Sequence, residues 1–597
     1  MNRLLRVCNS TFHNCTVLTI AILLAGSLLA GGNASAMAVR DAVISVPGDF
    51  STIQEAIDNA SDGQTIEVHS GIYTESLFID KDLTLLAVAG PGLTMIDADG
   101  AVTAVSIGTV EGDFDAETGI HPDFVRIEGF NVTGWTERGI AQRLGAGTVE
   151  IIGNQITATE GDTRGGITIS GGQNSRIEGN IVLGTPFSEE GFSSTGIITV
   201  GSMDAEIVDN QVSGTDIGIA LAAGFPGIDP AWEISSGVMV SGNEVSGTGF
   251  GIALFGHVLA ADLIDNTVTN VSGHAFTVGP FDASEQYAED LLIAGNHAVD
   301  FGTRAYSSAT NPVARIELRD NYFQSSISGS WGIQLGDGTS DGLLTGNEID
   351  VDGVALNPRA VSDIVIAGND LAGGIVAIGM SLDGHVNNQI VDNRISGGVV
   401  LQNGANTDGY VLSGNELLGG AGSLGIAIAT DATFSSGPLA GTCNWWDDPS
   451  GPSDEGTGQG SIVTEHVEFE PWNTAPGGPC DGDAAFADTL VAASATHLAG
   501  SPDTALPAQD LPTVLVLDQY GNPFEGATIT FALQSSTGSI SGEIQDSDGD
   551  GLAQLGSWVL GDEPEQSLTA SATGLTGNPI TFTVDVDAIF HDRFESP

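Results

Sequence analysis

The 597-residue chain contains very little positive charge. Its 15 lysines and arginines stand against 77 aspartates and glutamates, for a formal net charge of −62, and Lys81 is the only lysine. A surface this acidic repels the phosphate backbone, which excludes nucleic acid as a partner. It also repels acidic polysaccharides unless cations screen or bridge the contact. Adaptation to salty surroundings explains this composition better than any specific acidic site does.

Long apolar runs are also scarce. Beyond the first 36 residues, no apolar run approaches the ~18 residues that a membrane-spanning helix requires. Residues 1–36 contain Arg3 and Arg6, then an apolar stretch over 17–30, then the small residues 34–36. This layout is typical of a secretory signal peptide. We therefore expect a protein that is secreted or held at the cell surface, with no transmembrane segment in its mature chain.

Cysteine occurs only four times. Cys8 and Cys15 lie in the predicted signal peptide, so export leaves Cys443 and Cys480 as the cysteines of the mature chain. Outside the cell the surroundings are oxidising, and two such cysteines are expected to pair. The sequence therefore predicts a disulfide between Cys443 and Cys480.

What the chain does contain is a short repeated phrase. Eleven asparagines follow one another about every 26 residues, which indicates a stacked repeat architecture. Each is preceded by Gly or Asp, has Ile, Val or Leu three residues before it, and has an apolar residue two places after it. The asparagines are Asn154, Asn180, Asn210, Asn243, Asn266, Asn296, Asn321, Asn347, Asn369, Asn393 and Asn415.

The residues around each asparagine alternate between apolar and polar, which is the pattern of a β-strand. Second alternating runs such as Gly-Ile-Thr-Ile at 166–169 and Gly-Ile-Ala-Leu at 251–254 lie upstream. Short strands and tight turns within a repeat of this length predict the coil of a parallel β-helix. Asn tolerates the left-handed backbone of a sharp corner, and its amide can bond to the asparagines of adjacent coils. We expect a right-handed all-β solenoid with an asparagine ladder.

The start of the repeat region carries a family resemblance. Ser51-Thr-Ile-Gln fits a capping box, and Ile53, Ala56 and Ile57 share one face of a short helix that would cover the open end of the solenoid. This segment, followed by Gly71-Ile-Tyr-Thr-Glu, resembles the opening of pectin-lyase-like β-helix proteins. That superfamily mixes lyases, hydrolases, esterases, epimerases and binding proteins, so the resemblance implies a fold and leaves the activity open.

The end of the repeat region resembles the same family. Cys443-Asn-Trp-Trp-Asp-Asp-Pro-Ser-Gly-Pro is similar to the closing segment of many such helices, and it implies that Trp445 and Trp446 cover the last coil. We expect the β-helix, with its N-terminal cap helix and its C-terminal cap, to occupy residues 37–480.

The chain changes character after the predicted β-helix. Residues 481–512 are rich in Ala, Asp and Pro and predict a linker with a first strand. Short alternating runs joined by Asp-Gly and Gly-Asn-Pro turns follow over 513–587 and predict a small β-sandwich. This segment resembles the group-one bacterial Ig-like domain of invasin and intimin type, which implies a spacer or adhesive unit. Residues 588–597 form a C-terminal tail to which we assign no function.

Several long loops between residues 184 and 306 carry aromatic and acidic residues. If they leave the same side of the solenoid, they could line one groove suited to a sugar polymer, although isolated aromatics could equally pack onto the solenoid. The substrate-binding candidates are Phe187, Phe192, Phe225, Trp232, Phe281 and Tyr287.

The best catalytic candidates fall within about one repeat of one another. His274 could act as a base, Tyr306 as an acid, and Arg304 as a clamp on a carboxylate. Asp282 could ligate a cation, and calcium is the only cofactor that the sequence leaves open. Each also has an ordinary interpretation, as a turn histidine, a solvated acid or one member of a surface ion pair. No catalytic motif of the lyases or hydrolases is recognisable.

Three functions remain. The first is recognition of a polysaccharide or another cell-surface polymer without catalysis. The alternative is a polysaccharide lyase or glycoside hydrolase with a non-standard site in the loops between 184 and 306. The third is a purely structural stalk. An enzyme should bring a His or Tyr and an Arg or a bound cation within hydrogen-bond reach in one groove. A binder needs only exposed aromatics along one face, and a stalk needs neither.

Overall fold

The structure is a computed structural model. It describes residues 43–108, 121–142, 147–158, 165–184, 194–223, 234–279, 288–308, 311–378, 385–402, 409–429, 437–483 and 485–586. The predicted signal peptide and the C-terminal tail lie outside these residues.

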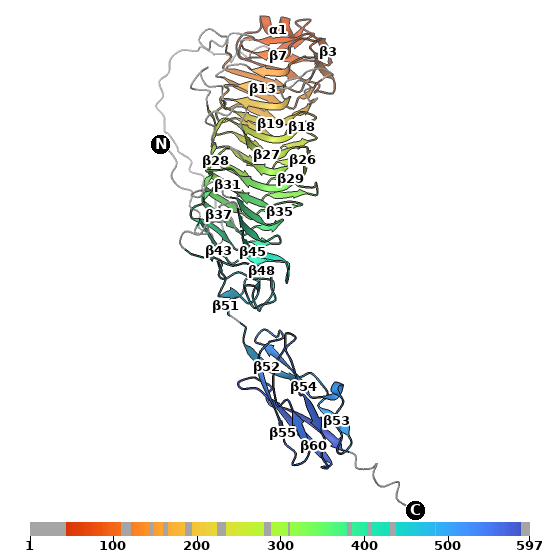
Figure 1. Cartoon of the computed structure of the whole chain (residues 1–597). Coiled ribbons are helices and arrows are strands. Elements are labelled where there is room, and N and C mark those ends of the chain that lie inside the picture. Colours follow the sequence, from red (N-terminus) through yellow and green to blue (C-terminus); the bar gives the residue numbers. More distant parts are fainter. Residues whose placement is uncertain are drawn as a thin grey trace, which may run out of the picture. The chain divides into compact units, whose positions relative to one another are not determined.

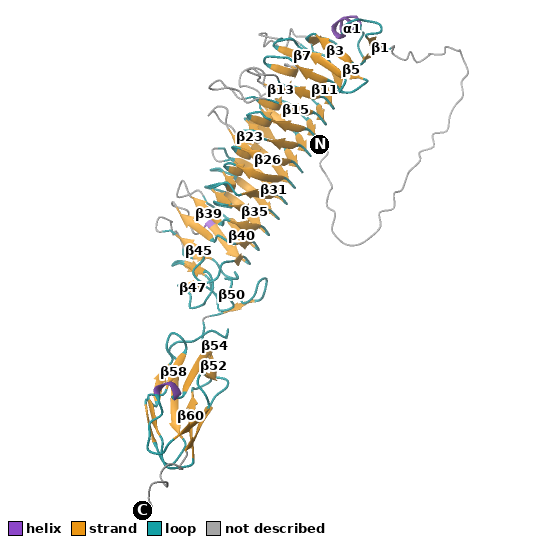
Figure 2. Cartoon of the chain, turned by 90° about the vertical axis from the view of Figure 1, so that its right-hand side faces the viewer, coloured by secondary structure: helices purple, strands orange, loops and turns teal. Residues whose placement is uncertain are grey.

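Residues 44–468 form a parallel β-solenoid of about 14 turns, seen from two sides in Figures 1 and 2. Each turn contributes strands to three long sheets, which we name A, B and C, and strands of successive turns pair in parallel. The all-β solenoid predicted from the asparagine repeat is confirmed.

The strands of the three sheets are as follows. Sheet A contains β1 (Ile44–Val46), β2 (Gln64–Val68), β5 (Leu83–Ala87), β8 (Phe124–Glu128), β11 (Thr148–Ile152), β14 (Arg176–Glu178), β17 (Glu206–Val208), β20 (Ile234–Ser236), β21 (Met239–Ser241), β24 (His257–Leu259), β25 (Asp262–Ile264), β28 (Ala288–Ala294), β31 (Val313–Arg319), β34 (Ser340–Thr345), β37 (Ser362–Ala367), β40 (Asn388–Val391), β43 (Tyr410–Ser413), β46 (Leu439–Ala440) and β49 (Val467–Glu468). Sheet B contains β3 (Gly71–Thr74), β6 (Thr94–Asp97), β9 (Asn131–Thr133), β12 (Gln155–Thr157), β15 (Ile181–Leu183), β18 (Gln211–Ser213), β22 (Glu244–Ser246), β26 (Thr267–Val271), β29 (His297–Phe301), β32 (Tyr322–Ser325), β35 (Glu348–Val351), β38 (Asp370–Ala372), β41 (Arg394–Ile395) and β44 (Glu416–Leu417). Sheet C contains β4 (Leu77–Ile79), β7 (Thr103–Ile107), β10 (Arg138–Gln142), β13 (Gly165–Ser170), β16 (Thr195–Val200), β19 (Ile217–Ala222), β23 (Phe250–Phe255), β27 (His274–Gly279), β30 (Arg304–Ser307), β33 (Trp331–Leu335), β36 (Leu356–Pro358), β39 (Ile375–Ile378), β42 (Val399–Gln402), β45 (Leu424–Ile428), β47 (Ser453–Asp454) and β48 (Ile462–Val463).

The apolar core fills the inside of the solenoid. In β8, for example, Val125 and Ile127 are buried while the residues on either side of them are partly exposed. The same two-residue alternation recurs in many strands of sheets A and B, because successive side chains of a β-strand point to opposite faces. Sheet C departs from it: β19, for example, is buried at all six positions. Most of the buried residues form one cluster from Ile44 to Trp472, and Ile217, Ala220 and Ala253 of sheet C form a separate small one.

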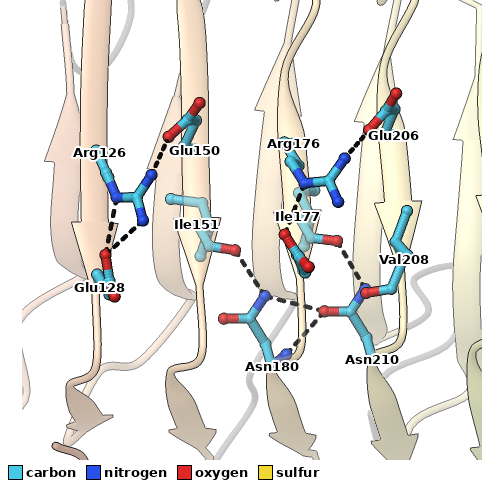
Figure 3. A network of polar contacts seen from close by, with 11 residues as sticks. Arg126, Glu128, Glu150, Ile151, Arg176, Ile177, Asn180, Glu206, Val208 and Asn210 are labelled. Atoms are coloured by element: carbon cyan, nitrogen blue, oxygen red, sulfur yellow. Dashed lines mark hydrogen bonds and ion pairs between the residues drawn. The ribbon is translucent and has the colours of Figure 1, made fainter.

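A ladder of buried asparagines runs along the turn between sheets A and B. The side-chain amide of Asn180 donates to the carbonyl oxygen of Ile151 over 2.8 Å and to Oδ1 of Asn210 over 2.9 Å. The backbone N–H of Asn180 also donates to Oδ1 of Asn210 (Figure 3). The same bonds recur for every predicted asparagine from Asn154 to Asn415. Each turn is thus bonded to the next by side chains as well as by strands.

Arginine–glutamate groups line part of the outer face of sheet A. Arg126 contacts Glu128 of its own strand at 2.6 Å and Glu150 of the next turn at 2.7 Å. Arg176 contacts Glu178 and Glu206 in the same way, as Figure 3 shows. These contacts surround two of the chain's few cations with carboxylates.

Helix α1 (Ile53–Asn59) covers the first turn and buries Ile53, Ala56 and Ile57, as predicted. Its N-cap is Thr52, whose hydroxyl accepts from the Glu55 backbone N–H, so the cap lies one residue later than the sequence suggested. The Glu55 carboxylate accepts from the backbone N–H of Ser51. Among the described residues, no helix is long and apolar enough to cross a membrane.

The other end of the solenoid is closed by tryptophans. Trp446 and Trp472 are almost fully buried, and Trp445 is 7% exposed. The hairpin of β50 (Trp472–Asn473) and β51 (Cys480–Gly482) follows, and the predicted disulfide between Cys443 and Cys480 is confirmed.

The strands after residue 485 have a core of their own, which runs from Leu490 to Val586. They pair in antiparallel fashion apart from β53 and β61, in sheets of three, five and two strands. Two of the strands and η2 fall within 481–512, the predicted linker. The elements are β52 (Ala487–Ala492), β53 (His497–Gly500), η2 (Ala508–Asp510), β54 (Thr513–Asp518), β55 (Thr528–Leu533), β56 (Ser539–Ser541), β57 (Ile544–Asp546), β58 (Leu552–Gln554), β59 (Ser557–Val559), β60 (Glu565–Ser571) and β61 (Ile580–Val586).

Candidate ligand-binding site

Four partly exposed side chains lie in register where sheet C begins on four consecutive turns. Phe250, His274, Arg304 and Trp331 are the first residues of β23, β27, β30 and β33. The strand register pairs His274 with Arg304, and Arg304 with Trp331. Phe250 is 39% exposed, and the other three are intermediate between buried and exposed. We call this set the corner column, because it follows the turn that joins sheets B and C.

The members of the corner column contact one another from turn to turn. The ring centroids of Phe250 and His274 lie 5.6 Å apart in an edge-to-face arrangement. Nδ1 of His274 is 2.6 Å from the hydroxyl of Thr303 on the next turn. Cζ of Arg304 lies 5.1 Å from the centroid of the Trp331 ring, within the range of a cation–π interaction. Phe250 thus contacts His274, Arg304 contacts Trp331, and the strand register of His274 and Arg304 joins the two pairs.

Arg304 differs from the other arginines in lacking an acidic partner. Among the described residues, every other arginine forms an ion pair with Asp or Glu, as Arg126, Arg176 and Arg394 illustrate. Nε of Arg304 is enclosed and has no hydrogen-bond partner in this part of the chain. Burial, and then the charge of Arg359, lower the pKa of Arg304 from its usual value. The guanidinium is nevertheless charged at neutral pH, because an arginine pKa lies so far above 7.

His274 is held neutral. Burial lowers its pKa to about 4, and the neighbouring charge of Arg304 acts in the same direction. At neutral pH the corner column therefore has one positive charge, on Arg304. The uncharged imidazole adds a flat ring and a hydrogen-bonding nitrogen beside it.

Tyr306 does not occupy the position that its predicted role needs. It follows Arg304 by two residues in β30, but its side chain lies fully inside the solenoid core. Burial raises the pKa of its hydroxyl above the ordinary value. A buried phenol that holds its proton so firmly cannot donate it to a polymer on the outer surface. The acid role predicted for Tyr306 therefore does not fit the structure.

Asp282, the predicted cation ligand, and the six predicted aromatic residues of the loops lie outside the described part of the chain. Among the residues that the structure describes, no group of three or more His, Cys, Asp or Glu side chains could hold a metal ion. The aromatic candidates outside the described residues are Phe187, Phe192, Phe225, Trp232, Phe281 and Tyr287.

On the preceding turns, the positions in register with the corner column carry smaller side chains. These positions are Gly165, Thr195 and Ile217, and the register pairs Ile217 with Phe250. Next to Gly165 and Thr195 lies a cavity of about 10 Å³, which Trp135 helps to line. That is room for roughly one water molecule. That cavity is lined by none of Phe250, His274, Arg304 and Trp331, whose partial exposure places the candidate site on the surface of the solenoid.

Sequence reasoning brought His274 and Arg304 together but missed Phe250 and Trp331. A signal was present: both aromatics stand two residues before a core isoleucine, in Phe250-Gly-Ile and Trp331-Gly-Ile. His274-Ala-Phe and Arg304-Ala-Tyr have the same spacing, so aligning the repeats on their second strand would have placed all four in one column.

The fold defines this chain as a parallel β-solenoid protein. No protein-family model matches it, and a search of curated proteins finds no relative. Among solved structures, a tailspike protein of E. coli bacteriophage HK620 in complex with a pentasaccharide is 11% identical, with a TM-score of 0.39 over 89% of this chain and 88% of that one. PfbA, a surface adhesin of Streptococcus pneumoniae, is 14% identical, with a TM-score of 0.34 over 68% of this chain and 92% of the adhesin chain. DFA-IIIase from Arthrobacter chlorophenolicus is 14% identical, with a TM-score of 0.38 over 66% of this chain and 100% of the DFA-IIIase chain.

Proposed function

We propose that this is an exported protein that binds a polysaccharide along the corner column without chemically altering it. The observation that carries the proposal is the alignment of Phe250, His274, Arg304 and Trp331 on consecutive turns, each partly exposed. Carbohydrate sites typically combine aromatic rings with a few hydrogen-bonding groups. The corner column has this composition.

The geometry of a solenoid suits an extended polymer. Successive turns are ~4.8 Å apart, so a chain lying along the solenoid axis meets one member of the corner column at each turn. Because parallel pairing and the asparagine ladder fix every turn, the four side chains are held in place before a ligand arrives. Such preorganisation lowers the entropic cost of binding.

Catalysis by the corner column is disfavoured. General acid–base catalysis needs a proton donor and a proton acceptor within hydrogen-bond reach of one substrate. Tyr306 is enclosed in the core, and Arg304 holds its proton too firmly to act as an acid. His274 adjoins Arg304, the pairing expected of an enzyme, but its pKa of about 4 makes it a weak base and leaves no imidazolium proton to donate at pH 7.

Two other features of the chain support export of the protein from the cell. The disulfide between Cys443 and Cys480 fits an oxidising compartment, in agreement with the predicted signal peptide. We assign the solenoid to the right-handed, pectin-lyase-like class and the strands over 487–586 to the bacterial Ig-like class. In this assignment the second unit serves as a spacer or an adhesive module.

Affinity electrophoresis on a panel of neutral and acidic polysaccharides tests the proposal. We expect at least one polymer to retard the wild type, and Trp331→Ala to abolish the retardation. Tyr322→Ala is the matched control, because Tyr322 stacks on His297 at 4.7 Å on the outer face of sheet B. Equal losses in both variants, or no retardation by any polymer, would contradict the proposal. Release of unsaturated or reducing sugar ends that stops in His274→Ala would establish an enzyme instead.

A further inference from the structure

We infer that Arg304 is an anion subsite that takes a carboxylate of the ligand, so that the polymer recognised is an acidic polysaccharide. The inference names the ligand class of the corner column and in that respect rests on the proposed function. Arg304 is the one arginine in the described residues that forms no ion pair with a carboxylate.

An arginine without an acidic partner is unexpected in this chain. Acidic residues outnumber basic ones by 77 to 15, so an arginine seldom lies far from a carboxylate. Arg126 and Arg176 each have two glutamates, and Arg315 contacts both Glu289 and Asp290. Within the described residues, Arg304 is thus the one arginine that forms no ion pair with Asp or Glu.

The surroundings of Arg304 leave it incompletely satisfied. Its Nε is enclosed and makes no hydrogen bond within the described residues. Trp331 faces the guanidinium, but a ring contact does not use the in-plane N–H donors. The charge of Arg359, which is itself paired with Asp337 at 3.4 Å, also disfavours the charged form of Arg304, although less than burial does. Partial burial makes it costly to leave the charge unpaired, and an external anion that binds the Nη donors, which are not among the enclosed atoms, would lower that cost.

A carboxylate is the anion that fits best. The guanidinium is planar and presents parallel N–H donors to which the two oxygens of a carboxylate can bind. The neutral ring of His274 adjoins it without adding a competing charge, and Phe250 and Trp331 supply apolar faces for the sugar rings on either side. A uronate residue held at Arg304 thus has neighbours that suit the rest of its polymer.

The net charge of −62 makes the binding of an acidic ligand depend on salt concentration. At long range the protein repels a polyanion, and this repulsion is screened by salt, because the Debye length falls from ~30 Å at 0.01 M to ~8 Å at 0.15 M. The local contact with the half-buried Arg304 is screened much less. Binding therefore strengthens as salt rises over this range, opposite to the behaviour of a ligand held mainly by surface ion pairs.

A titration of the full chain labelled with ¹⁵N-arginine tests the subsite without requiring the polymer. The Nε–H signal of Arg304 is assigned from its absence in Arg304→Lys, and the protein is titrated with glucuronate and, in parallel, with glucose. We expect glucuronate alone to shift the Arg304 signal. The signal of Arg394, which is already paired with Asp370 at 3.2 Å, serves as the internal control and stays in place. No shift at Arg304, or the same shift with glucose, overturns the inference.

A second experiment separates failure of the subsite from failure of the proposed function. Polygalacturonate and its carboxyl-reduced, neutral form are compared by affinity electrophoresis with wild type, Arg304→Gln and Arg394→Gln. We expect the acidic polymer to retard the wild type at least ten times more strongly than the neutral form, and Arg304→Gln to remove that difference. Equal retardation by both polymers would overturn the anion subsite and leave the proposed function standing. Retardation by neither, together with none by the wider panel, would overturn the proposed function.

Discussion

Arg304 and Trp331 lie side by side on consecutive turns, with the guanidinium carbon 5.1 Å from the centre of the indole ring. This pair joins the two properties that make the corner column a candidate site: an apolar face, and a positive charge that forms no ion pair within the described part of the chain. The parallel register of β30 and β33 fixes the pair, so its geometry depends on the solenoid as a whole. Any change that disturbs the stacking of the turns should therefore also disturb the geometry of the corner column.

The asparagine ladder is expected to be a major source of stability. Asn243 accepts two hydrogen bonds from Asn210 and donates to Asn266 and to the carbonyl of Ile207. Asn243→Ala would leave several of these buried groups unsatisfied, at about 1–3 kcal/mol each. We expect a loss of roughly 2–5 kcal/mol in the free energy of unfolding, measured with urea. The adjacent exposed substitution Gln211→Ala should change it by less than about 0.5 kcal/mol, and equal effects would contradict a structural role for the ladder.

The disulfide is expected to stabilise the closed end of the solenoid. Cys443 and Cys480 are 37 residues apart in sequence. Closing a loop of this length removes chain entropy equivalent to about 4 kcal/mol from the unfolded state. Cys480→Ala should lower the unfolding midpoint, and a reducing agent should lower it equally in the wild type but leave the variant unchanged. A midpoint insensitive to reduction in the wild type would contradict this role.

His274 is expected to make stability depend on pH. Its pKa in the folded protein is about 4, below the value of about 6.5 for a free histidine, so the unfolded state binds more protons between these values. The folded state should therefore lose stability as the pH falls from about 6.5 to 4, and this contribution should be absent above about pH 7. The shift sets an upper limit of roughly 3 kcal/mol. Urea titrations of the wild type and His274→Gln at pH 7 and pH 5 measure the difference, and identical pH dependence would contradict a buried, neutral His274.

Salt is expected to strengthen the binding of an acidic polymer. The wild type should bind polygalacturonate more tightly at 0.15 M than at 0.01 M sodium chloride, because long-range repulsion is screened while the Arg304 contact persists. The dissociation constant from isothermal titration checks this, with the carboxyl-reduced polymer as the control that should show little salt dependence. Weakening of the acidic complex with salt would contradict this picture.

Local repetition is what made the fold predictable from the sequence. Each asparagine of the ladder lies in a phrase with fixed neighbours, so the period and the strand pattern could be read directly. Asn444 was missed, although it extends the ladder by accepting from Asn415 over 2.9 Å. It follows Cys443 and not Gly or Asp, yet Cys443 has the same left-handed backbone, with φ of 60°. The residue before each ladder asparagine adopts the same backbone conformation, but its identity changes from Gly or Asp to Cys at position 443.

The site was only partly predictable, for a different physical reason. Repeat length placed His274 and Arg304 close together, and their register confirms that proximity. Strand alternation alone would put Arg304 and Tyr306 on one face, but Arg304 stands at the corner while Ala305 and Tyr306 both lie in the core. A corner interrupts the two-residue alternation, and its position follows from the stacking of turns. The loop residues could not be placed by period at all, because insertions have no equivalent in other turns.

Hydrogen–deuterium exchange of the full chain, with and without a retained polysaccharide, tests the central claim most directly. Binding to the corner column predicts protection of the peptides that begin β23, β27, β30 and β33, because their backbone lies under the polymer. The peptides of β29 and β32 on sheet B should exchange at unchanged rates. Protection confined to other surfaces, with none at these four strand starts, would show that the corner column is not the binding site.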